Sequence, residues 1–152
     1  MKKIMGGKEM ECIIKGMAEI IKKEIGLTES IAIVGIKRRG AVLADRIKKY
    51  LSKDIPVGYL DITFYRDDFS TVDKHPVVSE TDVLFDIDGK KVLLVDDVLF
   101  TGRTIRAALD ALTDMGRPAL VKLLVLIDRG YRELPISADF AGMRVETKKS
   151  EM

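Results

Sequence analysis

Thiol and imidazole groups are almost missing from this sequence of 152 residues, which contains one cysteine and one histidine. The single thiol, Cys12, excludes an internal disulfide framework and a cysteine-ligated zinc site, and such usage is typical of a reducing cytosol. His75 has no acid, cysteine or second histidine at a defined spacing, so we expect a solvent-exposed loop residue. Cys12 has no histidine near it in the sequence, which disfavours a nucleophilic role.

The sequence also lacks a strong charge of either sign and a long hydrophobic run. Charged residues make up 33% of the chain but leave a formal net charge of +2, so bulk charge neither requires nor excludes a nucleic-acid partner. No membrane-length apolar stretch follows the N-terminal lysines, and we expect a soluble, cytoplasmic protein with no membrane partner. With 47% hydrophobic residues, the chain can bury the core of a single α/β domain over residues 1–152, with a frayed tail at about 146–152.

Two common nucleotide-binding loops are missing as well. The sequence contains neither the G-x-x-x-x-G-K-[ST] loop of many ATPases nor a G-x-G-x-x-G loop after a predicted strand. Both an ATPase and a dinucleotide-binding enzyme are therefore disfavoured.

The most informative stretch of the chain is VLLVDDVLFTGRT, residues 92–104. Its unbroken apolar run, residues 92–95, predicts a strand that is covered on both faces of a parallel sheet. The carboxylates Asp96 and Asp97 follow at once, and a small polar loop then leads into a helix predicted over residues 103–115. The predicted order is strand, acids, polar loop and helix.

The small polar loop, TGRT at residues 101–104, is suited to bind a phosphate. A helix N-terminus presents unpaired N–H groups and the positive end of its dipole, Gly102 allows close approach to the backbone, and two threonines add hydroxyl donors. Asp96 and Asp97 would repel a phosphate, so they are better suited to sugar hydroxyls or a hydrated Mg²⁺. A phosphorylated ribose accompanied by a metal ion satisfies both requirements.

This order of residues resembles the phosphoribosyl-pyrophosphate (PRPP) loop of type I phosphoribosyltransferases. The variant DDVLFTGRT is closest to the PyrR family, whose members regulate the pyrimidine operon and are also uracil phosphoribosyltransferases. The resemblance runs from about Ile31 to Gly142, with further matches at residues 35–40, 61–68, 115–118 and 128–135. It implies one phosphoribosyltransferase domain with the type I fold, in which helices flank a mostly parallel central sheet beside a small hood and a mobile loop.

The resemblance also implies roles for individual residues. Asp96 and Asp97 would hold the ribose hydroxyls and the Mg²⁺ that accompanies PRPP, and Arg66 in the mobile loop would close over the site. These three are the implied catalytic residues. PRPP would also be bound by two loops, through Lys37, Arg38, Arg39, Thr101, Gly102, Arg103 and Thr104. Uracil would be bound, mainly by backbone groups, at Asp128, Arg129 and Gly130.

Two of these loops also stand out from the sequence itself. A strand predicted over residues 31–36 runs into a glycine-bracketed basic loop at 35–40, where open α/β sheets bind ligands, although a solvated basic turn is the alternative. The resemblance identifies it as the pyrophosphate loop and implies a non-proline cis peptide there. After a strand at 56–63, residues 65–82 lose the hydrophobic pattern and predict a lid, a binding loop or disorder.

The remaining segments predict helices and strands that cover or extend the sheet. An amphipathic helix over residues 10–25 is expected to pack on the sheet and to end at Gly26. A second helix, over residues 41–51, would turn four residues inward: Val42, Leu43, Ile47 and Leu51. Strands are predicted over residues 120–127 and 140–145.

The implied reaction is displacement of pyrophosphate from PRPP by uracil, which yields uridine monophosphate (UMP). In the 6-oxopurine members of the superfamily, the residue before Thr-Gly is an aspartate that can serve the purine. This chain has Phe100 there, which argues against a purine. A transferase for another base remains an alternative.

The resemblance implies a second activity, binding of pyrimidine operon leader mRNA, and a homo-oligomer of two or more chains. RNA binding needs a local basic face, and the candidates here are Lys15 and Arg132. Arg129 and Arg132 could equally be solvated surface charges. The chain departs from the family pattern at four positions, Gly16, Glu19, Tyr131 and Ser137. The departures at these four positions count against RNA binding. The second hypothesis, of a different class from an enzyme, is an RNA-binding attenuator that senses PRPP or UMP and has little enzyme activity.

Overall fold

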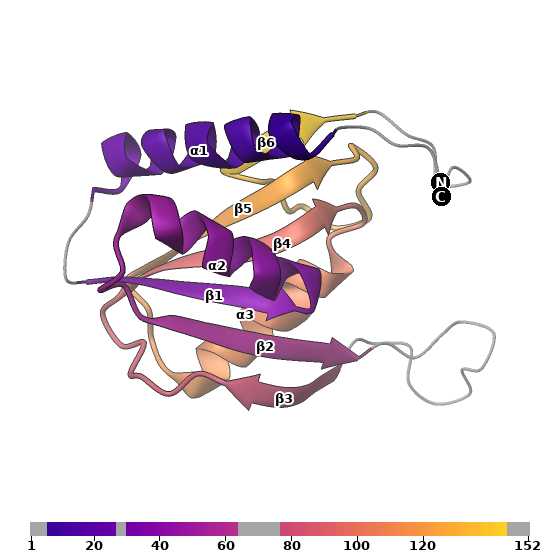
Figure 1. The fold of residues 1–152 in the computed structure, drawn as a ribbon. Coiled ribbons are helices and arrows are strands. Elements are labelled where there is room, and N and C mark those ends of the chain that lie inside the picture. Colours follow the sequence, from indigo (N-terminus) through magenta and orange to yellow (C-terminus); the bar gives the residue numbers. More distant parts are fainter. Residues whose placement is uncertain (1–5, 27–29, 64–76, 146–152) are drawn as a thin grey trace.

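The computed structural model describes residues 6–26, 30–63 and 77–145. Within these residues, six strands form one sheet in the order β3-β2-β1-β4-β5-β6 (Figure 1). The strand pairs are parallel except for β2 and β3, which are antiparallel. The elements in chain order are α1 (Gly7–Glu24), β1 (Ile31–Lys37), α2 (Arg39–Leu51), β2 (Val57–Thr63), β3 (Val77–Asp82), β4 (Lys91–Leu99), α3 (Arg103–Met115), β5 (Leu120–Asp128) and β6 (Phe140–Arg144).

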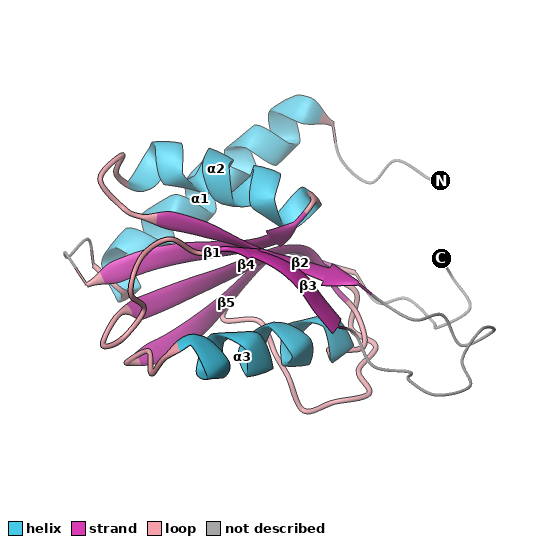
Figure 2. Ribbon diagram, turned by 90° about the horizontal axis from the view of Figure 1, so that it is seen from below, coloured by secondary structure: helices cyan, strands magenta, loops and turns pink. Residues whose placement is uncertain are grey.

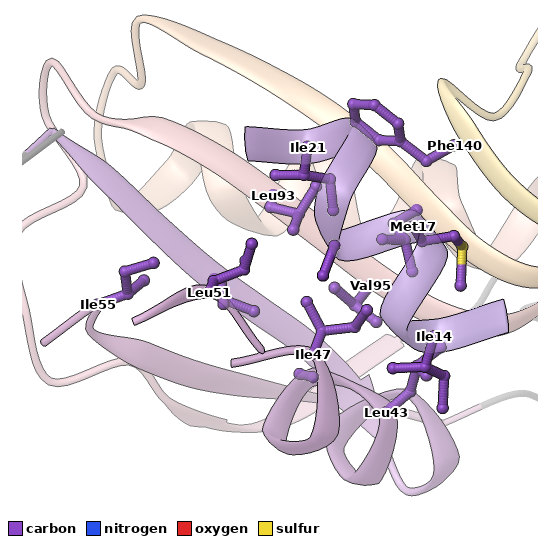
Figure 3. Packing of buried hydrophobic residues seen from close by; sticks show 14 of the residues in the cluster. Ile14, Met17, Ile21, Leu43, Ile47, Leu51, Ile55, Leu93, Val95 and Phe140 are labelled. Atoms are coloured by element: carbon purple, nitrogen blue, oxygen red, sulfur yellow. The ribbon is translucent and has the colours of Figure 1, made fainter. Parts of the chain in front are cut away.

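Helices cover both faces of this sheet. Figure 2 shows α1 and α2 on one face and α3 on the other. Alternate residues of the central strands feed two separate cores, so that Leu93 and Val95 pack with α1 and α2 while Leu94 packs with α3. The first core, drawn in Figure 3, is closed by Met17 of α1 and Ile47 of α2. Burial on both faces explains why the central strands are continuously apolar.

The direction of the chain across the sheet reverses between β1 and β4, which are neighbours. From β1 the chain passes through α2 to β2 on one side, and from β4 it passes through α3 to β5 on the other. The two helices therefore diverge from adjacent carboxyl ends, and the region between their N-termini is the usual ligand position in open α/β sheets. The fold class expected from the sequence is thus confirmed, and the implied hood remains a prediction.

Three expectations about the elements were wrong. Residues 77–82 form the edge strand β3, not part of a long irregular segment, because the polar sequence VSETD carries little of the hydrophobic pattern that marks a strand. The strand β4 extends to Leu99, so the two acids belong to the strand itself. Val42 is 60% exposed because it shares its side of α2 with the exposed Asp45 and Lys49.

Other expectations hold. The helix over residues 103–115 and the amphipathic N-terminal helix are both present, and Cys12 is exposed on the latter. Among the described residues, no helix has the length and apolar character needed to cross a membrane. Arg66, His75 and the tail at 146–152 lie outside the described residues.

Candidate active site

The basic loop after β1 (residues 37–40, the pyrophosphate loop below) leads directly into α2. The peptide bond between Lys37 and Arg38 is cis, as the resemblance implies. Arg38 is the N-cap of α2, no side chain caps this helix end, and its first turn has no acidic residue. The positive end of the α2 dipole thus coincides with Arg38 and Arg39, which are both exposed. This arrangement favours an anionic ligand.

The side chains of this loop are paired with acids of neighbouring strands. Lys37 Nζ lies 3.0 Å from Asp82 Oδ2 at the edge of the sheet. Arg39 Nη1 lies 3.9 Å from Asp97 Oδ2 on β4, although the Arg39 side chain is 81% exposed. The basic loop and the acidic pair are separated in the sequence by β2 and β3, but they meet at the carboxyl ends of the neighbouring strands β1 and β4.

A glycine makes this close approach possible. A Cβ on Gly40 would lie 2.6 Å from the carbonyl oxygen of Val95 and 3.0 Å from Asp96 Cα. Real Cβ atoms do not approach backbone atoms so closely, so a larger residue would push α2 away from β4. Gly40 thereby holds the N-terminus of α2 against the acidic end of β4.

The two carboxylates differ strongly in exposure. Asp96 is 7% exposed, and its Oδ1 accepts a hydrogen bond of 2.8 Å from the Asp97 N–H. Burial, together with the adjacent carboxylate of Asp97, raises the pKa of Asp96 to about 8. The Asp97 side chain is 28% exposed, with Oδ1 accepting from the Val98 N–H at 2.9 Å. Of the pair, Asp97 is therefore the one open to a ligand in this conformation.

The loop after β4 (residues 99–104, the phosphate loop below) begins α3 with a left-handed glycine. Gly102, the N-cap, has φ 96°, a conformation that other residues rarely adopt. The N-cap residue provides no side-chain cap and the first turn of α3 has no acidic residue, so this helix end is favourable for an anion. Thr101 Oγ1 accepts from the Arg103 N–H at 3.3 Å, and Arg103 Nε donates to Glu133 Oε1 at 2.8 Å. Thr104 is partly exposed in the first turn.

The loop after β5 (residues 128–136, the base loop below) is organised around a buried carboxylate. Asp128 is 3% exposed and accepts hydrogen bonds from the Gly130 N–H, Arg132 and Arg144. Burial alone would raise the pKa of Asp128, but the hydrogen bonds from Arg132 and Gly130, with the charges of both arginines, hold it below its usual range. Asp128 is thus an ionised residue inside the fold.

The base loop meets the phosphate loop through an aromatic and cationic stack. The Arg129 guanidinium lies 3.8 Å from the centre of the Phe100 ring, and the Phe100 and Tyr131 rings are 5.3 Å apart. The N–H groups of Arg129 and Gly130 are donated to Leu99 and to Asp128. The expected binding of uracil by backbone groups of this loop must therefore use groups other than these two donors.

Arg132 makes contacts that neither interpretation of the sequence included, the RNA contact or the solvated surface charge. Its guanidinium donates four hydrogen bonds within the fold and its side chain is 22% exposed, so most of its donors are already used. These bonds depend on backbone carbonyl oxygens, one of them in the phosphate loop, which a residue pattern cannot reveal. Lys15, the other RNA candidate, is exposed on α1.

The acidic pair is suited to a metal ion that a ligand helps to bind. Among the described residues, no group of three or more histidine, cysteine or acidic side chains could hold a metal by itself. Mg²⁺ commonly binds through one or two carboxylates together with the phosphates of a substrate. Asp97, partly exposed on β4 next to the pyrophosphate loop, fits that requirement.

Comparisons with known proteins agree with this geometry. The phosphoribosyl transferase domain family matches residues 2–150. A hypoxanthine-guanine phosphoribosyltransferase from Bacillus anthracis superposes with a TM-score of 0.81 at 17% identity, over 97% of this chain and 84% of that one. A purine phosphoribosyltransferase from Pyrococcus horikoshii gives 0.77 at 24% identity, over 95% and 89%. Fold and site together define a protein of the phosphoribosyltransferase class.

Curated relatives narrow this class further. Bifunctional protein PyrR of Caldicellulosiruptor bescii is 51% identical over 99% of this chain and 85% of its own length. Its counterparts from Roseiflexus and Thermus thermophilus are 58% and 51% identical, over 88% and 98% of this chain and 74% and 84% of their own lengths. The chain belongs to the PyrR family.

Proposed function

We propose that this chain transfers the phosphoribosyl group of PRPP to uracil, forming UMP and releasing pyrophosphate. The observation that carries the proposal is the presence of three chemical features at the carboxyl ends of β1 and β4. These are the basic N-terminus of α2, the partly exposed carboxylate of Asp97 and the N-terminus of α3, whose first turn has no acid. PRPP carries a pyrophosphate, sugar hydroxyls and a 5′-phosphate, which complement these features in turn. Membership of the PyrR family supports uracil as the base.

Each loop would bind one part of PRPP. The 5′-phosphate would accept hydrogen bonds from N–H groups at the start of α3 and from the hydroxyls of Thr101 and Thr104. Asp97 would accept hydrogen bonds from the ribose hydroxyls. The Asp96 carboxylate would keep Asp97 in position, because it accepts a hydrogen bond from the Asp97 N–H. The pyrophosphate would lie against the N-terminus of α2, with Lys37, Arg38 and Arg39 around it.

Catalysis at such a site would be electrostatic and positional. Negative charge builds on the departing pyrophosphate while the ribose becomes oxocarbenium-like, so cationic side chains and helix N-termini stabilise the transition state more than the ground state. No side-chain nucleophile is needed. When bound with PRPP, Mg²⁺ would supply further charge neutralisation at the pyrophosphate. Arg66, outside the described residues, is proposed to close over the site and exclude water.

The base would be bound next to the stack of Phe100, Arg129 and Tyr131. Phe100 occupies the position where an aspartate serves the purine in 6-oxopurine transferases, and it packs directly against the base loop. An apolar ring offers no hydrogen-bond partner to a purine. A pyrimidine therefore suits this end of the site better, with Asp128 fixing the shape of the loop from inside.

The proposal is tested by incubating the protein with PRPP, Mg²⁺ and a panel of bases, and measuring pyrophosphate release and nucleotide products. We expect UMP from uracil. Release of no UMP would refute the proposal, and a purine nucleotide as the main product would favour a transferase for another base.

We also propose that the chain binds pyrimidine operon leader mRNA in the presence of uridine nucleotides, acting in the cytoplasm as a homo-oligomer. The relatives are named bifunctional, which favours a second activity. Lys15 is exposed on α1 and could contact RNA phosphate, whereas Arg132 is occupied within the fold. Bandshifts with leader RNA should strengthen when UMP is added. Binding that depends neither on the RNA sequence nor on added UMP would refute this second activity.

A further inference from the structure

The phosphate loop and the base loop are joined along their length by hydrogen bonds. The Arg129 N–H donates to the Leu99 carbonyl at 2.9 Å. The N–H groups of Glu133 and Leu134 both donate to the Thr101 carbonyl, at 2.9 and 3.2 Å. The loops that would bind the two ends of a nucleotide therefore form one structural unit.

Arg132 lies at the centre of this unit and bonds to both loops. Its Nη2 donates to Asp128 Oδ1 at 2.7 Å and its Nε to the Ile136 carbonyl at 2.7 Å, which ties the start of the base loop to its end. Its Nη1 donates to the Phe100 carbonyl at 2.8 Å, in the phosphate loop. A planar guanidinium can make these three bonds at once, whereas a lysine ammonium is a single point that cannot span them.

We propose that Arg132 is a positioning residue that locks the base loop to the phosphate loop. It sets the separation at which the base and the 5′-phosphate of one nucleotide are recognised. The inference rests on the proposed function for its ligands, but the lock itself is a property of the two loops. Arg132 acts through the Phe100 carbonyl and not by touching substrate.

Arg144 provides a matched control. It also donates to Asp128, at 2.8 Å, but to the other oxygen, Oδ2, and from β6. Its side chain is 65% exposed, and within the described residues it makes no hydrogen bond to the phosphate loop. Neutralisation of Asp128 is therefore shared by two arginines, whereas the bond to Phe100 belongs to Arg132.

The decisive variant is Arg132→Lys, which keeps a positive charge beside Asp128 but loses the three-way bond. The phosphate loop would hold the 5′-phosphate equally in the ground state and in the transition state. Displacement of this loop should therefore weaken the binding of both states by the same amount. We expect the KM for PRPP to rise about tenfold while kcat falls less than about threefold, with Arg144→Gln close to wild type in both. A wild-type KM in Arg132→Lys, or an equal rise in Arg144→Gln, would show that only the charge matters and would overturn the proposal.

Amide hydrogen exchange tests the lock without any activity. Arg132→Lys should speed the exchange of the Arg129, Glu133 and Leu134 amides, which bond to the phosphate loop, and Arg144→Gln should not. Unchanged exchange in Arg132→Lys would overturn the lock. If the wild-type protein makes no UMP, the proposed function fails, and the exchange comparison still decides the inference.

Discussion

Asp96 and Asp97 are neighbours in the chain, yet the strand that carries them gives each a different environment. Alternation along β4 sends successive side chains to opposite sides, and the close contact of Gly40 with the backbone of Val95 and Asp96 shields one carboxylate. Asp97 remains partly exposed beside Arg39. The two carboxylates that the sequence predicted to share one task are thus divided into a buried one and a partly exposed one.

Replacing Asp97 with asparagine should abolish turnover and spare the fold. The amide oxygen can still accept from the Val98 N–H, but the negative charge toward the ribose is lost. We expect kcat/KM to fall by at least about 100-fold, with Tm within a few degrees of wild type. Asp110→Asn on the exposed side of α3 is a charge-matched control. Activity near wild type in Asp97→Asn would show that the site has been misassigned.

Asp96 predicts a dependence of stability on pH. Its pKa is raised from 3.8 to about 8 in the folded protein, so between these values the folded state keeps a proton that the unfolded state has released. This group therefore makes the free energy of unfolding fall as pH rises from about 4 to about 8, and adds no further change above that. Asp96→Asn should flatten this decline in denaturant unfolding measured across the same pH range. Parallel curves for the two proteins would contradict the prediction.

The roles of residues could be anticipated only where a role follows from local pattern. The phosphate loop was recognisable because strand, acids, threonine-glycine and helix follow one another within 13 residues of sequence. The role of Arg132 could not be, because its partners include the carbonyl oxygens of Phe100 and Ile136, which carry no side-chain signature. Contacts made through the backbone are invisible to residue patterns.

At the scale of elements, the buried helices and strands were predictable and the sheet edge was not. The helix α3 agrees with its predicted bounds because an apolar stripe faces one core and Gly116 follows it. The edge strand β3 is defined by its antiparallel pairing with β2, in which partners lie far apart in the sequence, from Thr63 with Val77 to Tyr59 with Asp82. Edge strands bury one face at most, so their hydrophobic pattern is weak.

The junction between α2 and β4 can be tested with a glycine variant. Gly40→Ala would place a methyl group 2.6 Å from the Val95 carbonyl and force the helix away from the strand. We expect a loss of about 1–3 kcal/mol in the free energy of unfolding and weaker PRPP binding. Gly16→Ala, on the exposed side of α1 with nothing within 4 Å, should instead stabilise by about 0.5–1 kcal/mol. Equal effects in urea unfolding would contradict this reading of Gly40.

At the scale of the whole molecule, the site exists because the sheet reverses direction between β1 and β4. Two helix N-termini that belong to opposite layers converge there, and each is preceded by a loop that suits an anion. A ligand that contacts both loops bridges the two layers. The alternation of strands and helices in the sequence predicted this architecture, whereas the order of the strands in the sheet had to come from the structure.

Binding of PRPP with Mg²⁺ should therefore stabilise the entire fold. At a free ligand concentration of 100 times Kd, linkage gives about 2.7 kcal/mol, which for a protein of this size raises Tm by several degrees. Thermal unfolding with and without ligand measures the shift, with Asp97→Asn as the control that should show little. An equal shift in both proteins would indicate that the ligand binds elsewhere.

The contact between α1 and β6 bears on how the protein is made. Ile13 and Met17 of α1 pack over β6, where a Cβ on Gly142 would lie 2.5 Å from Ile13 Cγ2, and Figure 1 shows the two elements side by side. The helix α1 precedes every described strand, and this part of its apolar side is covered only by β6, which follows all the other described strands. Nascent chains that stall before residue 140 would therefore leave apolar side chains of α1 exposed to solvent and to chaperones.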